Sequence, residues 1–375
     1  MLAIFLLRLR RLSPVPSMLG VVFSIVVTAS NAGEQALDAP LGSISLNPDT
    51  VVTRVAFGSC FKAQRPEDRV WDAVSRYKPD LFLFAGDALY PDQDDDSPAL
   101  EHLRAAYRAL AEVRPFERLR QQVPVLPVWD DHDYGSNDGG GDFAFKAESE
   151  ALFENSWGIE ASDPRRSRPG IYFSQTLGLA GQRLQLIVLD TRYFRSGLTA
   201  ARVSGVRGIE RYMPSSQDGQ MMLGAAQWGW LEKELGKAAD LRIIVSSIQV
   251  LADGHGWEGW KQLPAEQAKF FNLLRRHGNT PLVLLSGDRH VAGFYARDIG
   301  LTAPLLEFTS SALNNTISFP YRELTLAEAG PFRLGELYGG ASFGTLDIDW
   351  DSGLLSLAIR SDSGVLLRML NRRFR

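Results

Sequence analysis

The chain has 375 residues, of which 45% are hydrophobic and 22% charged, and its 40 basic and 44 acidic side chains give a net charge of −4. A chain of this length and composition can bury a large core as one domain or as two. Its acidic balance argues against a general nucleic-acid partner, because affinity for the phosphate backbone needs clustered cations.

Residues 1–32 have the pattern of a secretory signal. Three arginines between positions 8 and 11 precede an apolar stretch at 18–27, and the small residues Ser30 and Ala32 lie before the expected cleavage point. Removing this leader leaves 37 basic against 44 acidic residues, a net charge of −7. We therefore expect a periplasmic or secreted protein, with an uncleaved anchor as the alternative and a weak indication of twin-arginine export. A lead-in segment at 33–50 follows, and the remainder, 51–375, is expected to form the main domain.

Strands and helices are predicted to alternate after the lead-in. Short apolar runs rich in β-branched or aromatic residues predict strands at 51–57, 81–85, 125–129, 184–189, 243–248 and 282–285. Helical periodicity with suitable ends predicts helices at 66–77, 97–110, 143–157, 225–238 and 265–277. Ser97 and Pro98 are expected to be the N-cap and first residue of the second helix. Near-continuous apolar strands indicate sheets covered on both faces, and hence a layered α/β core.

The pattern changes near the C-terminus. Residues 343–350 and 354–359 alternate in polarity and are joined by Asp351-Ser352-Gly353, which predicts an antiparallel hairpin. The Gly-x-Ser-x-Gly motif at 340–344 is typical of serine hydrolases, but a strand follows where a helix is needed and no histidine comes after His290. A serine-hydrolase triad is therefore excluded.

Five polar clusters begin where apolar runs end, and they carry thiol, carboxylate, phenol and imidazole groups. The carboxyl ends of strands in an α/β sheet meet at one crevice, so these groups are expected to converge. The clusters are Gly58-Ser59-Cys60, Gly86-Asp87-Ala88-Leu89-Tyr90, Trp129-Asp130-Asp131-His132-Asp133, Asp190-Thr191-Arg192 and Ser286-Gly287-Asp288-Arg289-His290.

Each cluster also has a purely structural interpretation. Cys60, the single cysteine, is a metal ligand protected from oxidation or an inert buried thiol. Asp87 can bridge two cations with Tyr90 reaching the same ion, although a Gly-Asp-x-x-Tyr turn is common in itself. Asp131-His132-Asp133 after a buried strand needs a cation or hydrogen bonds to compensate its charges, which favours a functional role.

Asp288 and His290 are expected on the same side of an extended segment. His255 lies in a Gly/Trp loop that either lines a substrate mouth or caps the core. The acidic run at 92–96 lacks the glycine and glutamate of a calcium loop, so a solvated lid beside the metal centre is preferred over calcium binding.

Taken together, these motifs and Trp-Asp-Asp-His-Asp-Tyr-Gly-x-Asn-Asp at 129–138, Leu-Asp-Thr-Arg at 189–192, His-Gly-Trp-Glu-Gly-Trp at 255–260 and Ser-Gly-Asp-x-His at 286–290 resemble the PhoD-like alkaline phosphatase D family. This family is a branch of the calcineurin-like metallophosphoesterases, and the resemblance covers about residues 51–350. It implies a four-layer α/β/β/α sandwich, finished here by the C-terminal β-hairpin, that hydrolyses phosphate mono- or diesters with Fe³⁺ and Ca²⁺ in the site.

The resemblance also implies roles for individual residues. Six are expected to bind metal, with Asp87 bridging: Cys60, Asp87, Tyr90, Asp131, Asp288 and His290. His132 is implied as the catalytic histidine beside the leaving group. The superfamily's first Asp-x-His is replaced by Gly-Ser-Cys60, and its mid-chain histidine by Gln249 or Ser247, so these departures bear on which metals bind and not on whether metals bind.

The side chains support this chemistry independently. Phosphoryl transfer to water needs a hydroxide at neutral pH and cations that offset the phosphoryl charge, and two metals supply both. Thiolate and phenolate ligands favour Fe³⁺, whereas aspartates suit Ca²⁺ or another divalent ion. Arg192 or Arg195 is expected to hold a phosphate oxygen, with a salt bridge as the alternative for Arg192. Asn137, Arg195 and His255 are the expected substrate-binding residues.

The expected substrate is a phosphate-ester small molecule or a phospholipid. The alternative function is that of a non-catalytic exported protein with a structural metal site.

Overall fold

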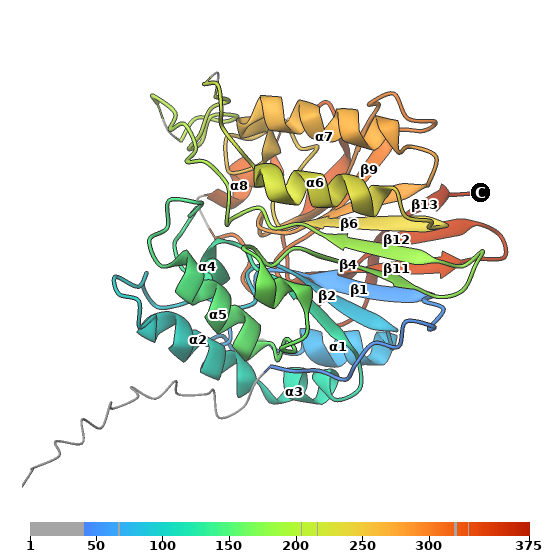
Figure 1. The fold of residues 1–375 in the computed structure, drawn as a ribbon, viewed down its shortest axis with the longest axis horizontal. Coiled ribbons are helices and arrows are strands. Elements are labelled where there is room, and N and C mark those ends of the chain that lie inside the picture. The colour runs from blue at the N-terminus through green and yellow to red at the C-terminus, as the bar shows by residue number, and fades with distance from the viewer. Residues whose placement is uncertain (1–40, 67, 204, 216, 319–320, 329) are drawn as a thin grey trace, which may run out of the picture. The chain divides into compact units, whose positions relative to one another are not determined.

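Two mixed β-sheets stacked face to face form the centre of the protein in this computed structural model (Figure 1). The structure describes residues 41–375 except 67, 204, 216, 319–320 and 329. The predicted signal at 1–32 and positions 33–40 of the lead-in lie outside the described residues. Within the described residues, no helix has the length and apolar character that a membrane span requires.

The first sheet has six strands in the order β13-β12-β11-β1-β2-β3. Its parallel half contains β1, β2 and β3, and its antiparallel half contains β11, β12 and β13. The bounds are β1 Arg54–Gly58, β2 Leu81–Ala85, β3 Val125–Val128, β11 Ser342–Asp349, β12 Leu354–Ser361 and β13 Leu366–Arg373. The predicted C-terminal hairpin is β11–β12, and it belongs to this sheet because β11 pairs with β1.

The second sheet has seven strands in the order β10-β8-β9-β7-β6-β5-β4. Strands β5, β6, β7 and β9 run parallel, and β4, β8 and β10 are antiparallel to their neighbours. The bounds are β4 Phe173–Leu177, β5 Leu184–Val188, β6 Leu241–Ser246, β7 Leu282–Ser286, β8 Ala292–Arg297, β9 Leu305–Ser310 and β10 Arg333–Tyr338.

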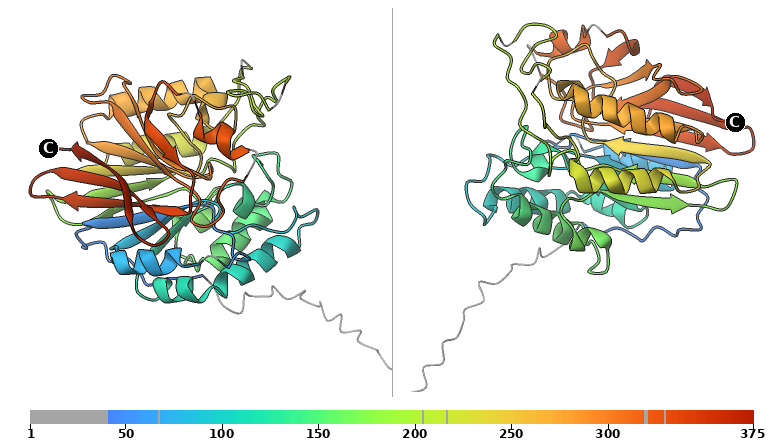
Figure 2. Two further views of the ribbon diagram at one scale, coloured as in Figure 1. Left: turned by 180° about the vertical axis from the view of Figure 1, so that it is seen from behind. Right: turned by 45° about the horizontal axis from the view of Figure 1, so that its top comes forward.

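Helices cover the outer face of each sheet. The bounds of the helices are α1 Val70–Tyr77, α2 Glu101–Ala111, α3 Arg114–Arg120, α4 Asp131–Tyr134, α5 Lys146–Ser156, α6 Gly224–Leu235, α7 Pro264–Arg276 and α8 Tyr321–Leu326, with 3-10 turns at Pro164–Ser167 and Trp260–Gln262. Helices α1, α3 and α5 lie on the side of the first sheet, and α6 and α7 on the side of the second (Figures 1 and 2). The expected four-layer α/β/β/α fold with C-terminal strands is confirmed.

Strands β5, β6 and β7 inside the second sheet are buried on both faces, as their largely apolar sequences predict. In β6, Ile243 and Val245 belong to the core between the two sheets, whereas Ile244 packs into the separate core under α6 and α7. Successive strand residues point to opposite faces, so one apolar run supplies both cores. On the other side, Trp71 of α1 contacts Phe82 and Phe84 of β2 edge to face or tilted.

Helix α2 begins later than predicted. The sequence placed Ser97 at the N-cap and Pro98 in the first turn, but the helix starts at Glu101. The carboxylate of Asp95 accepts the backbone N–H groups of His102 and Leu103 at 2.9 Å each, which satisfies orphan donors of the first turn. This contact gives one member of the acidic run at 92–96 a structural role, and none of that run lines the cavity described below.

Candidate active site

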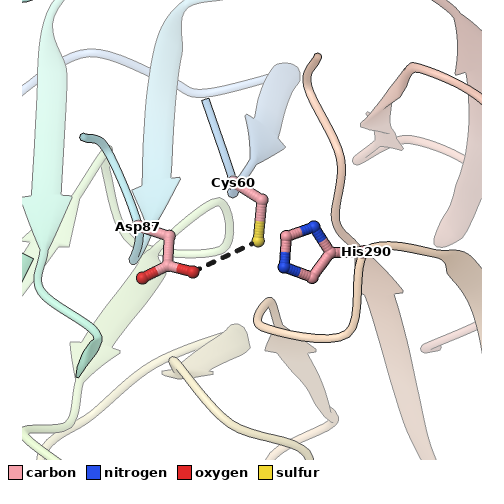
Figure 3. Close-up of side chains that lie close together, drawn as sticks. All are labelled: Cys60, Asp87 and His290. Carbon is pink, nitrogen blue, oxygen red and sulfur yellow. Dashed lines mark hydrogen bonds between the residues drawn. The ribbon is translucent and has the colours of Figure 1, made fainter. Parts of the chain in front are cut away.

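The predicted cluster residues follow the carboxyl ends of parallel strands in both sheets. Cys60 follows β1, Asp87 follows β2 and His290 follows β7. One ligand atom from each of these three side chains lies within 4.8 Å of the others. Figure 3 shows the three side chains pointing toward one another from different segments of the chain, with the Cys60 Sγ 3.4 Å from an oxygen of Asp87.

Tyr90 and His290 are oriented by their own hydrogen bonds. The Tyr90 hydroxyl donates to Asp87 Oδ2 at 2.7 Å, so the phenol oxygen reaches the same place as the thiol. His290 Nδ1 is hydrogen-bonded to the carbonyl of Asn315. An imidazole that donates from Nδ1 to a carbonyl keeps its lone pair on Nε2, which is how metal-binding histidines are usually held.

The backbone is strained at these positions. Cys60, Asp87, Asp288 and His290 have φ values of 58°, 53°, 66° and 55°, in the left-handed region that residues with a Cβ rarely adopt. Such strain costs about 1–3 kcal/mol per residue and is concentrated at functional sites. The prediction of an extended segment through Asp288 and His290 is therefore wrong, because both residues turn the chain sharply and direct their side chains to the cavity.

Asp131, His132 and Asp133 begin the short helix α4 and have different environments. Asp133 is buried and accepts the backbone N–H of Ala88 at 3.0 Å and of Asp87 at 3.3 Å, which holds the loop after β2. Asp131 accepts the backbone N–H of Asp138 at 2.8 Å and lines the cavity. His132 also lines the cavity, half-buried, with its ring centroid 4.2 Å from that of Tyr90.

Burial dominates the electrostatics of this cluster. It raises the pKa of the Cys60 thiol, and it raises the pKa values of Asp87 and Asp288 well above their usual range, with Asp131 and Asp130 respectively as the largest charged contributors. It also lowers the pKa of His290 to about 4. The neutral forms of Cys60, Asp87, Asp288 and His290 are therefore favoured when no cation is present. At Asp131, burial is instead outweighed by the charges of His132 and Arg192, which lower the pKa of the carboxyl.

A metal ion would reverse this balance. Carboxylates, thiolate, phenolate and a neutral imidazole are all metal ligands in their deprotonated forms, and a cation supplies the charge that the buried acids lack. The donor set at this site therefore fits a metal. Asp87, Asp131 and His132 form a second group of potential ligand atoms within 4.8 Å of one another, so Asp87 lies between two candidate positions.

These residues surround a cavity of about 180 Å³. Its wall combines aspartates and histidines with arginine and aromatic side chains. The lining residues are Asp87, Asp131, His132, Asn137, Asp138, Arg211, Trp257, Glu258, Asp288, Arg289, His290, Ile317 and Tyr321. Of the predicted substrate-binding residues, only the exposed Asn137 is in this lining.

Arg192 and Arg195 lie behind the cavity in a buried ion-pair network. Arg192 is fully buried and pairs with both Asp130 and Glu258, and Arg195 pairs with Glu258 at 2.7 Å. The structure therefore contains the salt bridge that the sequence left as the alternative for Arg192. Neither guanidinium lines the cavity, so the expectation that one of them grips a phosphate oxygen is corrected.

Replacing Arg192 with methionine is expected to lower the free energy of unfolding by about 3–5 kcal/mol, because it leaves Asp130 buried without its cationic partner and Glu258 paired with Arg195 alone. The matched change at Arg118, whose pair with Asp72 is solvent-exposed, is expected to cost at most about 1 kcal/mol. Urea unfolding of both variants measures the difference. Unchanged stability together with weaker substrate binding in the Arg192 variant would restore the phosphate-contact hypothesis.

His255 caps the core and does not line the cavity. It is 2% exposed, with Nε2 2.9 Å from Gln249 Oε1 and Nδ1 accepting the Trp257 N–H at 3.2 Å. Both ring nitrogens are therefore occupied by protein. Its loop contributes through Trp257 and Glu258, which do line the cavity. Ser247, one of two positions expected to replace a superfamily histidine, donates to Asp130 Oδ1 at 2.7 Å and supports the network behind the site.

Several residues at the site were not singled out from the sequence. Ser311 follows β9, and its hydroxyl oxygen lies 3.0 Å from Cys60 Sγ. The same oxygen accepts the backbone N–H of His290 at 2.7 Å. No motif marks this serine. Asp138 and Glu258 stand inside quoted motifs, at 129–138 and 255–260, and form a further acidic group with Asp131. Arg211 is paired with Asp138 at 2.7 Å.

The two-sheet fold with a metal-ligand cluster at the strand ends places the protein in the metallophosphoesterase class. A family model described as PhoD-like phosphatase matches residues 55–333, more than half of the chain. The chain belongs to the PhoD-like phosphatase family and is a phosphoesterase, which confirms the resemblance drawn from the motifs. A comparison with curated proteins gives no match.

One solved structure, that of PhoD, supports the fold, and two others match with lower TM-scores. The structure of PhoD is similar with a TM-score of 0.68 and 16% identity over 88% of this chain and 70% of that one. TT1561 of Thermus thermophilus gives a TM-score of 0.34 and 10% identity over 86% of this chain and all (100%) of that one. A 5'-nucleotidase precursor from the same organism gives a TM-score of 0.32 and 16% identity over 86% of this chain and 54% of that one. The similarity to PhoD extends across the two-sheet unit.

Proposed function

We propose that this phosphoesterase is an exported, metal-dependent hydrolase of the alkaline phosphatase or phosphodiesterase type. The observation that carries the proposal is the meeting of Cys60, Asp87 and His290 at one point, with the Tyr90 hydroxyl on Asp87, from segments far apart in the chain. The export part rests on the sequence pattern of residues 1–32 alone.

Two cations would be held by this donor set. Cys60, Asp87 and Tyr90 suit Fe³⁺, because thiolate and phenolate need a strongly polarising ion. Asp131 and Asp288 suit Ca²⁺ or another divalent ion beside it, with Asp87 shared between the two positions. His290, whose ligand atom lies within 4.8 Å of those of Cys60 and Asp87, could serve the iron position. Bound metals would supply a nucleophile at neutral pH and offset the negative charge of the phosphoryl oxygens.

The protein's own groups would then do the positioning and the proton transfer. His132 lines the cavity beside Asp87 and Asp131, and we assign it to proton transfer rather than to a metal, so that its imidazole would protonate the departing alkoxide. The tilted ring contact with Tyr90 and the helical turn of α4 limit its rotation. Asp133 holds the loop of Asp87 in place, and the Arg192 network holds the loop that follows β3.

Assays with an aryl phosphate and a bis-aryl phosphate, with elemental analysis of the same preparation, test the proposal. We expect hydrolysis of at least one ester, stoichiometric iron, and a visible absorption band from tyrosinate or thiolate charge transfer to iron. An active, metal-replete protein without iron or colour would exclude Fe³⁺ and leave the hydrolase intact. A metal-replete protein that cleaves neither ester would instead favour a non-catalytic protein with a structural metal site.

A further inference from the structure

Arg289 is a buried arginine on the cavity wall that lacks a carboxylate partner. It is 5% exposed, and its Nε and Nη2 atoms are buried without a hydrogen bond to any residue that the structure describes. No salt bridge within the described ranges includes it. A guanidinium stays protonated in proteins, and a buried charge without a partner is costly. The environment of Arg289 is therefore incomplete without an acceptor.

The other arginines of this region are already neutralised. Arg192 and Arg195 pair with Glu258 behind the cavity, and Arg211 pairs with Asp138 at 2.7 Å on its wall. Asp288 and Glu328 lie near enough to Arg289 to affect it electrostatically, but neither forms a salt bridge with it in the described structure. Arg289 thus differs from these three arginines because its positive charge has no salt-bridge partner among the described residues, although it is buried.

The unpaired atoms of Arg289 define what can bind. Nε and Nη2 share one edge of the guanidinium plane, which is closed to solvent here and can donate two parallel hydrogen bonds to a carboxylate or a phosphate once the side chain turns it toward the cavity. The guanidinium carbon lies 6.0 Å from the Trp257 ring centroid, and Trp257 meets Tyr321 edge to face at 5.9 Å. Ile317 lines the cavity with them. A cation beside aromatic and aliphatic surface suits an oxyanion attached to an organic group.

We propose that Arg289 is a substrate-binding residue whose Nε–Nη2 edge holds an oxyanion of the ester, while Trp257 and Tyr321 contact its organic part. This inference rests on the proposed hydrolase function. The oxyanion has two sources with the same chemistry, the phosphoryl group that is cleaved or a second acidic group on the same substrate. The substrate class is accordingly a phosphoester with a flat or apolar organic group.

The test compares Arg289→Met and Arg289→Lys with wild type and with Arg118→Met, a surface arginine on α3 outside the cavity. Substrates are phenyl phosphate and carboxyphenyl phosphate, and inorganic phosphate is the inhibitor. Loss of two charge-assisted hydrogen bonds is expected to raise KM about 10- to 100-fold in Arg289→Met, with a smaller change in kcat. Arg289→Lys is expected to recover part of the loss, because it keeps the charge and loses the fork.

The source of the oxyanion follows from the pattern. If Arg289 holds the cleaved phosphoryl group, KM rises for both substrates and the inhibition constant of inorganic phosphate rises with it. If it holds a second acid, KM rises for the carboxyl substrate alone and inhibition by phosphate is unchanged. Wild-type KM and inhibition constants in folded Arg289→Met, or in Arg289→Gln if the methionine variant does not fold, overturn the inference.

Failure of the proposed function can be distinguished from failure of the inference about Arg289. The proposed function fails if metal-replete wild-type protein cleaves no phosphoester, and this outcome also overturns the inference, since no substrate then exists for Arg289 to bind. Active wild type with insensitive Arg289 variants overturns the inference alone. Calorimetric titration of the metal-loaded proteins with inorganic phosphate measures the affinity of Arg289 variants and wild type for a phosphoryl oxyanion, the first of the two sources, without depending on turnover.

Discussion

Purified Asp87→Asn protein is expected to contain little iron and to lose turnover by about three orders of magnitude or more. Asp87 lies between both groups of potential ligand atoms and accepts the Tyr90 hydroxyl, so one neutral amide would weaken both candidate metal positions. Metal-ion catalysis supplies several kcal/mol of transition-state stabilisation, and about 4 kcal/mol corresponds to a factor of about 10³. Elemental analysis and initial rates on an aryl phosphate measure the two effects.

The control for this variant is its stability without metal. Burial raises the pKa of Asp87 well above its usual range, so the metal-free fold loses stability from this carboxyl at neutral pH, where the carboxyl of the unfolded chain is ionised. Asparagine has nearly the same shape and carries no charge, and metal-free Asp87→Asn is therefore expected to melt at the same temperature as metal-free wild type or higher. Added metal should raise the melting temperature of wild type alone. Full iron content and turnover in the variant would contradict the assignment of Asp87.

Replacing His132 with alanine is expected to lower turnover by about two to four orders of magnitude while leaving the iron content and the melting temperature near those of wild type. His132 is half-buried on the cavity wall, where its ring contacts Tyr90, and it is not part of the hydrophobic core. A group that protonates the leaving alkoxide matters more when that alkoxide is a strong base. The loss should therefore be larger for an alkyl phosphate than for nitrophenyl phosphate.

His102→Ala is the matched control, because His102 lies on α2, outside the cavity, and is hydrogen-bonded to Gln93. It is expected to keep wild-type rates on both substrates. An equal loss on alkyl and aryl esters in His132→Ala would point to a role in positioning rather than proton transfer. Wild-type turnover in that variant would remove His132 from the mechanism and revive the structural-metal hypothesis.

Burial explains which strands the sequence predicted and which it did not. All six predicted strands are present, with ends shifted by up to three residues, because both faces of these strands are apolar. Strands β4, β8, β9, β10 and β13 were missed. In β13 most side chains are exposed or half-buried, so no apolar run marks it. In β9 a buried glutamate, Glu307, interrupts the pattern; it accepts the backbone N–H groups of Val250 and Leu251 at 2.8 and 2.6 Å.

The candidate site divides in the same way. Its metal-ligand side was predicted because aspartate, histidine, cysteine and tyrosine stand directly after buried strands, where a charged or reactive side chain needs a reason to be present. Part of the remaining cavity lining comes from segments whose residues carry no such signal. Arg211, Ile317 and Tyr321 reach the cavity from distant segments, and the roles of Arg192 and Arg289 could not be distinguished from their residue type.

The amino-acid sequence by itself determined the layered α/β fold, the family and four members of the groups of potential ligand atoms, Cys60, Asp87, Asp131 and His290, because apolar periodicity and polar residues at strand ends are local properties of the chain. The tertiary structure alone decided which charges are paired. Whether an arginine is neutralised depends on carboxylates far away in sequence: Glu258 comes to Arg192 and Arg195 and does not come to Arg289. A side chain's availability for substrate is set by such long-range neighbours, and no local pattern contains them.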